Sequence, residues 1–247
     1  MMAQAPTVLL LATFGLEVVE CGALARNADA GGRSEAAVLL SRVESRPEVE
    51  RAAEILSTKV RFLEKRYGEV APDVEHKRRV VEVLRSVRPD IVITQDPEHS
   101  FEDLDPDRRP AMTLYLEALA LAGRDWQVEA CGGWAPHSAR VVYYMTPRQP
   151  NCIIDVALAW ERKQRALAEL GSQLAFSGQT FRRLFGAGLR ALLPEEASMD
   201  DTGVGLALHH HLDRAFHLYH GAGHHGRFLL AEPYRRQDLF HLDTLVV

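Results

Sequence analysis

The sequence lacks several features that mark specialised classes of protein. Its 247 residues include three cysteines, Cys21, Cys131 and Cys152. They form no CxxC pair, which excludes a disulfide framework and a thiolate zinc cluster. Glycine (17) and proline (12) are at average levels, so long collagen-like or disordered segments are excluded. No apolar run approaches the roughly 18 residues that a membrane helix needs.

A surplus of basic residues is also missing. Lys and Arg together number 29 and Asp and Glu 34, which gives a formal net charge of −5. A general nucleic-acid binder would show a basic face instead. The first apolar run, residues 8–12, is too short for the core of a signal peptide, and no basic segment precedes it. We therefore expect a cytoplasmic protein that binds neither nucleic acid nor a membrane.

The arrangement of apolar runs predicts an α/β fold. Short continuous apolar runs, typical of buried parallel strands, occupy residues 7–12, 36–40 and 91–94, and a further short strand is expected at residues 60–63. Segments with helical character separate them at residues 19–30, 47–56 and 76–88. This alternation predicts a Rossmann-like, mostly parallel sheet with helices on both faces, in three α/β/α layers.

The second half of the chain continues the pattern less regularly. Strands are expected at residues 140–145 and 152–156, helices at residues 110–122, 157–170 and 205–220, and a loop at residues 189–205. A chain of this length often forms a single α/β domain. We expect one domain spanning residues 1–247, in which about 179–247 form a C-terminal helical and loop cap.

Two loops are the expected place of the chemistry, because ligands of an open parallel sheet bind at the carboxyl ends of its strands. One loop, residues 13–17, follows the first strand. The other, residues 95–109, follows the fourth strand and is long and acidic. Its carboxylates and His99 have the chemistry of a divalent-cation site. Arg108 and Arg109 lie among them, which favours a solvated loop with internal ion pairs.

Both loops resemble motifs of the PIG-L/LmbE-type zinc-dependent de-N-acetylases. The segment ATFGLEVVECGALAR (12–26) stands where that family has AHPDDE followed by a Cys-Gly-rich helix start. DPDRR (105–109) stands where the family has HPDHR, and LAEPYR (230–235) matches its closing AE-aromatic-R element. The resemblance extends over nearly the whole chain. It implies the family fold and the family reaction, which removes acetyl groups from amino-sugar conjugates.

The resemblance also implies that the first zinc motif has been replaced. The family's zinc-binding His and second Asp fall on Thr13 and Leu16, and the Asp that serves as general base falls on Gly15. Glu17 is retained. A leucine side chain has no lone pair to offer a metal. Without the Asp, no general base stands beside the reacting water.

The resemblance implies that the zinc ligands of the second motif have been replaced as well. The family's third zinc ligand falls on Arg108, the first His of that motif on Asp105, and a later His on Leu170. Arginine carries a permanent positive charge that repels a metal cation. We therefore expect no cofactor at the family site and interpret the chain as a catalytically degenerate ligand-binding or accessory protein. Whether it is an enzyme stays open.

On this interpretation the partner is a small sugar-like or anionic ligand. Its expected contacts are Thr13, Arg46, Arg108, Arg109 and His137. The family often forms trimers or hexamers, so the resemblance also implies a possible homo-oligomer.

Two alternatives stay open at this point. The first is an active amidohydrolase or N-deacetylase with a rebuilt acid–base site at Glu17, His99 and Asp105, or with zinc bound elsewhere. His209, Asp213 and His217 follow an i, i+4, i+8 line on one helix face, which is a possible metal site. The sequence favours the simpler interpretation of that line as the polar face of an amphipathic helix. The second alternative is a nucleotide-binding α/β protein.

Overall fold

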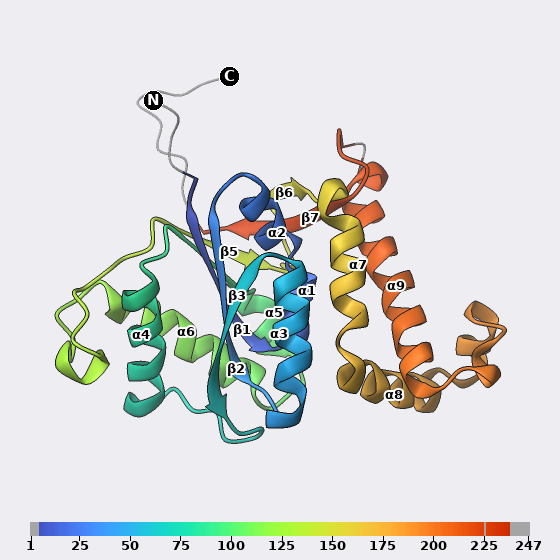
Figure 1. Ribbon diagram of the computed structural model, residues 1–247, viewed down its shortest axis with the longest axis horizontal. Helices are drawn as coiled ribbons and strands as arrows, with labels where there is room; N and C mark the ends of the chain where they lie inside the picture. Colours follow the sequence, from blue (N-terminus) through green and yellow to red (C-terminus); the bar gives the residue numbers. More distant parts are fainter. Residues whose placement is uncertain (1–4, 225, 238–247) are drawn as a thin grey trace.

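The computed structural model in Figure 1 describes residues 5–224 and 226–237. The described part contains seven strands in one sheet: β1 (Thr7–Phe14), β2 (Arg33–Leu40), β3 (Thr58–Lys65), β4 (Ile91–Gln95), β5 (Val141–Met145), β6 (Cys152–Asp155) and β7 (Ala231–Arg236). Their order is β3-β2-β1-β4-β5-β7-β6. Strands β1 to β5 run parallel, and β7 is antiparallel to both β5 and β6. The predicted mostly parallel sheet is confirmed.

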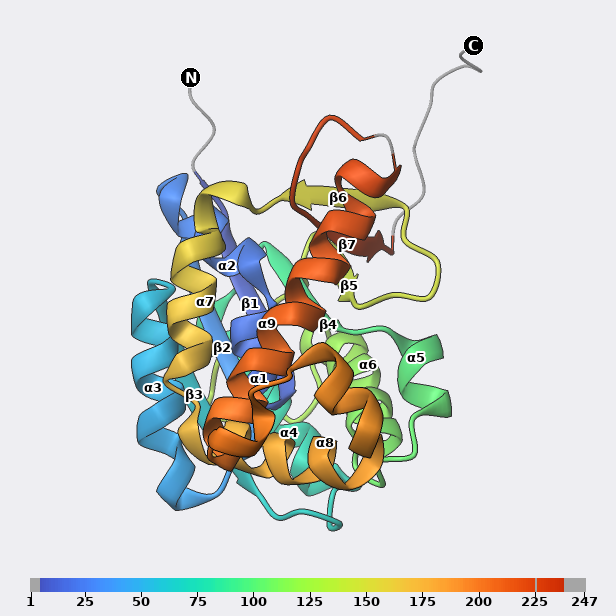
Figure 2. The same ribbon diagram turned by 90° about the vertical axis from the view of Figure 1, so that its right-hand side faces the viewer.

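The helices cover both faces of this sheet (Figure 1). In the described residues they are α1 (Leu16–Glu20), α2 (Gly22–Asp29), α3 (Arg46–Ile55), α4 (Val74–Val87), α5 (Pro97–Glu102), α6 (Arg108–Ala122), α7 (Trp160–Ala168), α8 (Gly171–Leu192) and α9 (Asp201–His220). Figures 1 and 2 show α4 and α6 on one face, α1, α2, α3 and α7 on the other, and α8 and α9 on the outer side of α7.

Strand β1 explains the two cores. It is apolar from Val8 to Ala12 because both of its faces are buried. Leu10 and Ala12 belong to the core under α1, α2, α3 and α7. Leu9 and Leu11 belong to the core under α4 and α6. The alternation follows from the period of two in a strand, so β1 is the central wall against which both helical layers pack.

Several predicted elements need correction. The helix expected at 19–30 is divided into α1 and α2 at Cys21, where φ is −86° and ψ is 80°. The acidic loop 95–109 contains α5, whose first turn is capped by the Asp96 side chain accepting from the amide of His99 at 3.1 Å. The loop expected at 189–205 contains the end of α8 and the start of α9.

The C-terminal region from about residue 179 holds the second half of α8, all of α9 and strand β7. Strand β7 lies inside the main sheet, between β5 and β6. Residues 225 and 238–247 of this region lie outside the described residues. None of the helices in the described part is long and apolar enough to cross a membrane.

Candidate functional site

The carboxyl ends of β1 and β4 bring the two predicted loops together. Helix α1 begins directly after β1, and α6 begins at Arg108 after the excursion through α5. The guanidinium of Arg108 forms an ion pair and a hydrogen bond with the carboxylate of Glu17. Two residues that are 91 positions apart in the sequence thus meet at the sheet edge where parallel strands place their ligands.

The carboxylate of Glu17 is fixed in place by burial and by a backbone hydrogen bond. Its side chain is buried, and its second carboxylate oxygen accepts from the backbone amide of Thr13 at 2.8 Å. Arg108 lies over the ring of Phe14, with 4.8 Å between the guanidinium carbon and the ring centroid, and its Nε is 3.5 Å from a carboxylate oxygen of Asp103. The cation is therefore bound on three sides by groups that favour positive charge.

Burial and charge act against each other in this pair. Burial raises the pKa of the Glu17 carboxyl above its ordinary 4.5, although the Arg108 guanidinium and the Thr13 amide act in the opposite direction. Burial works against the charged form of Arg108 as well. The carboxylates of Glu17, Glu20 and Asp103 outweigh it and raise the pKa of Arg108.

A cavity of about 500 Å³ opens over the ion pair, and we call it the Arg108 cavity. Six positions that the resemblance aligns with the family's motifs line it: Gly15, Leu16, Glu17, Asp105, Arg108 and Leu170. Thr13 is buried and contributes its amide to Glu17. Asp105 accepts from the amide of Asp107 at 2.9 Å, which fixes the turn before α6.

Thr13 does not line this cavity, and three more of the residues expected to bind ligand have other partners and do not line it either. Arg46 pairs with Glu64 at 2.9 Å. Arg109 is exposed and donates to the carbonyl of Phe101 at 3.2 Å. His137 lies at the amino end of β4, where its Nε2 is 2.8 Å from a backbone carbonyl oxygen. That is the edge of the sheet opposite to the cavity.

His99, expected as a catalytic residue, lies on α5 outside the cavity. Its Nδ1 is 3.2 Å from the carbonyl oxygen of Thr146, and its Nε2 is 4.0 Å from Asp103. Because Asp103 also pairs with Arg108, His99 is connected to the ion pair through that carboxylate.

Sequence reasoning missed several residues that do line the Arg108 cavity. Arg42 follows β2, and Gln173 and Phe176 lie on α8. The Ser172-Gln173 pair matches the family pattern, so it carried a signal for Gln173. Arg42 could have been found by the rule that places ligands at the carboxyl ends of parallel strands, because it follows β2 by two residues. Nothing in the sequence marks Phe176, because its place at the cavity depends on how α8 crosses the sheet edge.

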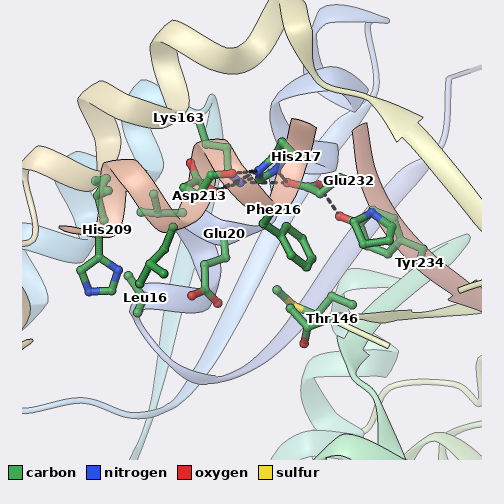
Figure 3. A pocket seen from close by; sticks show the side chains of 15 residues that line it. Leu16, Glu20, Thr146, Lys163, His209, Asp213, Phe216, His217, Glu232 and Tyr234 are labelled. Carbon is green, nitrogen blue, oxygen red and sulfur yellow. Dashed lines mark hydrogen bonds and ion pairs between the residues drawn. The ribbon is translucent and has the colours of Figure 1, made fainter. Parts of the chain in front are cut away.

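A second cavity, of about 450 Å³, lies beside the first, and we call it the Phe216 cavity (Figure 3). Leu16 and Glu20 line both cavities, so the two adjoin there. Residues of α1, α7, α9 and β7 form its wall, among them Val19, Leu167, Leu212, Phe216 and Tyr234.

A buried lysine organises one side of the Phe216 cavity. The Nζ of Lys163 is 3.1 Å from Asp213, 3.1 Å from Glu232 and 3.0 Å from Nε2 of His217. Burial opposes the charge of each member. The Lys163 ammonium nevertheless lowers the pKa of Asp213 and lowers that of Glu232 to about 2, while the two carboxylates raise the pKa of Lys163.

This arrangement bears on the prediction that His209, Asp213 and His217 form a metal site. Asp213 and His217 do meet, but the ammonium of Lys163 lies beside both. The ring of His209 turns elsewhere, with Nε2 3.0 Å from the hydroxyl of Ser177. In the part of the chain that the structure describes, no group of three His, Cys, Asp or Glu side chains is arranged to hold a metal ion.

Comparison with known proteins supports the resemblance. No family model matches the sequence. The diacetylchitobiose deacetylase of Thermococcus kodakarensis is 33% identical over 129 residues, which are 51% of this chain and 48% of that protein. The N,N'-diacetylchitobiose deacetylase of Pyrococcus horikoshii, solved with an inhibitor, superposes with a TM-score of 0.68 at 19% identity, covering 94% of this chain and 83% of that one. The resemblance to the PIG-L/LmbE-type deacetylases is confirmed.

The chain spans about half the length of the curated relative it matches, and the PIG-L/LmbE fold does not by itself fix the reaction. The 4-carboxy-2-hydroxymuconate hydratase of Pseudomonas putida KT2440 has the same fold, with a TM-score of 0.63 at 19% identity over 97% of this chain and 99% of that one. The chemistry of this chain must therefore be argued from its own site.

The residues present do not fit the zinc ion of the PIG-L/LmbE deacetylases. Where the resemblance places zinc ligands, this chain has the hydrocarbon side chain of Leu16 and the guanidinium of Arg108. Neither offers a lone pair to a metal. The retained carboxylate of Glu17 is already engaged by Arg108 and by the amide of Thr13.

Proposed function

We propose that this protein binds a small sugar-like polyol in the Arg108 cavity and does so without zinc. The observation that carries the proposal is the buried ion pair of Arg108 and Glu17. A cation that is covalently part of the chain stands beside the retained motif carboxylate, so a second, divalent cation would be repelled. In this role the Arg108–Glu17 ion pair forms the floor of the cavity, and its two charges neutralise each other. The residues of the cavity walls then contact the ligand.

The composition of the cavity favours a polyol over an anion. Its lining includes four carboxylates and two guanidinium groups, so its charge is negative overall. Carboxylate oxygens, the Arg42 guanidinium and the Gln173 amide accept from and donate to hydroxyl groups. Phe176 is 65% exposed and offers an apolar surface for the C–H face of a sugar ring. Relatives that act on diacetylchitobiose point to the same class of ligand.

A saccharide titration tests this proposal. Isothermal calorimetry with chitobiose and N-acetylglucosamine is expected to detect binding to protein made without a polyhistidine tag and stripped of metal. Gln173→Ala and Phe176→Ala should each weaken that binding by about fivefold or more, which corresponds to about 1 kcal/mol. Neither change removes a hydrogen bond or a buried side chain of the described structure.

Phe185→Ala is the matched control, because Phe185 lies on the same helix, is 50% exposed and does not line the cavity. The Phe185→Ala variant should bind saccharides with the same affinity as the wild type. Absence of binding to any saccharide at about 10 mM, or equal effects of Phe185→Ala and Phe176→Ala, would contradict the proposal.

The alternative function is an amide hydrolase that works with an acid–base group of its own. One observation favours it: the carboxyl of Glu20 lines the Arg108 cavity and has no ion-pair partner among the described residues. Release of acetate from N-acetylglucosamine substrates by metal-free protein, lost in Glu20→Gln, would establish the hydrolase. No release above the rate without protein would remove it.

A further inference from the structure

The Phe216 cavity has a mainly apolar wall and one carboxyl group without a counter-ion. Leu212 and Phe216 of α9 line it together with Leu16 and Val19 of α1. Figure 3 shows the carboxyl of Glu20 pointing into the open space between Leu16 and Thr146. An apolar cavity with a few converging polar groups is the usual form of a small-molecule site.

The other acidic side chains of this region already have cationic partners. Asp213 and Glu232 share the ammonium of Lys163, and Glu17 is paired with Arg108. Glu20 is partly buried and has neither a hydrogen bond nor an ion pair within the described residues. Among the carboxylates that line the Phe216 cavity, Glu20 is therefore the one without a cationic partner in the described residues.

The surroundings of Glu20 disfavour the ionised form of its carboxyl group when no cation is bound beside it. Burial and the nearby carboxylate of Glu17 raise the pKa of Glu20 to about 7, with a smaller contribution in the same direction from Asp213. Arg108 and Lys163 lower it, but both are committed to other carboxylates. A ligand cation beside Glu20 would stabilise the carboxylate and reverse this shift.

We infer that the Phe216 cavity binds a small organic amine, whose ammonium group pairs with Glu20 while its apolar body lies against Leu212 and Phe216. The ring of Phe216 also favours a cation at its face. The cavity of about 450 Å³ has room for a body of the size of a phenethyl group. This inference concerns the neighbouring cavity and a ligand of different charge, so it does not depend on the proposed polyol site.

Calorimetric titration of the tag-free protein with simple amines tests it. The probes are phenethylamine, benzylamine and cyclohexylamine, and phenethyl alcohol and phenylacetate are their neutral and anionic counterparts. Phosphate buffer at about pH 8 keeps Glu20 ionised and the amines protonated, and it avoids Tris, which is itself an amine. We expect phenethylamine to bind about tenfold more tightly than the alcohol, the usual scale of a charged hydrogen bond, and phenylacetate to bind most weakly.

Glu20→Gln removes the charge and keeps the shape of the side chain. We expect it to lower the affinity for phenethylamine by about tenfold and to leave that for the alcohol within about twofold. Glu54→Gln is the matched control, because Glu54 is an exposed glutamate of α3 outside both cavities, and it should bind like the wild type.

A pH series on the wild type gives an independent measurement should Glu20→Gln fail to fold. As the pH falls from about 8 to about 5.5, protonation of Glu20 should lower the ratio of amine to alcohol affinity by about tenfold. His209 and His217 also line the cavity and titrate nearby, but they remain in Glu20→Gln, in which the ratio should stay flat.

Three results would overturn the inference. They are equal wild-type affinities for amine and alcohol, no binding of any of the amines at about 10 mM, and an amine-to-alcohol ratio that does not change with pH in the wild type. Tighter binding of the alcohol than of the amines would assign the cavity to neutral hydroxyl ligands instead.

Discussion

At the scale of single residues, the site depends on one buried carboxylate and one guanidinium. Glu17 is 1% exposed, so it is removed from water and relies on Arg108 and the Thr13 amide for compensation. Breaking a buried pair by removing one partner leaves an uncompensated charge, which is far more destabilising than removing both partners.

Arg108→Met is therefore expected to lower the free energy of unfolding by about 3 kcal/mol at neutral pH. Because burial already raises the pKa of Glu17 above 4.5 in the folded protein, the variant is penalised where unfolded Glu17 is ionised. The penalty should fade as the pH drops below about 4.5, where unfolded Glu17 is protonated as well. Urea unfolding of wild type and variant at several pH values measures this.

The double change Glu17→Gln with Arg108→Met is the control for that experiment. It leaves no buried charge, so it should recover most of the lost stability. A single variant as stable as the wild type, or a double variant no better than the single one, would mean that the ion pair does not hold this site together.

At the scale of elements, the Lys163 cluster joins the outer helices to the sheet. Lys163 lies on α7, Asp213 and His217 on α9, and Glu232 on β7. Glu232 also accepts from the amide of Gly22 at 2.8 Å, so the start of α2 is tied to the same point. One buried carboxylate thus links four elements that are distant in the sequence.

Glu232→Gln should reveal this link through its pH dependence. The folded pKa of about 2 lies below the ordinary 4.5, so the carboxylate contributes stability above pH 4.5 that is lost as the pH falls towards 2. We expect the variant to lose about 3 kcal/mol at neutral pH and the difference from wild type to narrow in acid. Denaturant unfolding measures it, and a difference that stays constant from neutral to acidic pH would contradict the assignment.

Helices α8 and α9 cross so closely that glycine is required at their contact. A Cβ on Gly205 of α9 would stand 2.0 Å from the carbonyl oxygen of Leu174 on α8. Gly205→Ala should therefore push the helices apart and lower the free energy of unfolding by about 2 kcal/mol.

Gly188→Ala supplies the matched control for this crossing. Gly188 also lies on α8, but a Cβ there would meet nothing within 4 Å, so the change should stabilise the helix by up to about 1 kcal/mol. Equal thermal unfolding midpoints for the two alanine variants would contradict the close crossing.

Elements whose signal is local were predictable, and elements that depend on distant partners were not. Strands β1 and β4 are continuous apolar runs, so the sequence predicts them. Strand β7 carries Pro233 and several charged residues, and it exists because β5 and β6 pair with it. No local pattern encodes that pairing.

The same distinction applies to the candidate site. The rule that ligands gather at the carboxyl ends of parallel strands placed Glu17 and Arg108 together. The helical spacing placed Asp213 and His217 on one face. It could not show that Lys163 lies beside them, because the ammonium comes from another helix, 50 positions earlier in the chain.

At the scale of the whole molecule, the fold of this chain does not by itself determine its chemistry. The seven-stranded sheet belongs to a fold that superposes on the Pyrococcus horikoshii deacetylase over 94% of this chain. The chemistry has to be argued from this chain's own residues at the mouth of the sheet, where Arg108 supplies a fixed cation beside Glu17.

Metal content after exposure to zinc tests this central claim most directly. Tag-free wild type is incubated with excess zinc, freed of loose ions and measured by elemental analysis beside the triple variant Thr13→His, Leu16→Asp, Arg108→His. We expect less than about 0.1 zinc per wild-type chain and close to one per chain of the triple variant. About one zinc per wild-type chain, lost in Glu17→Ala, would contradict the account.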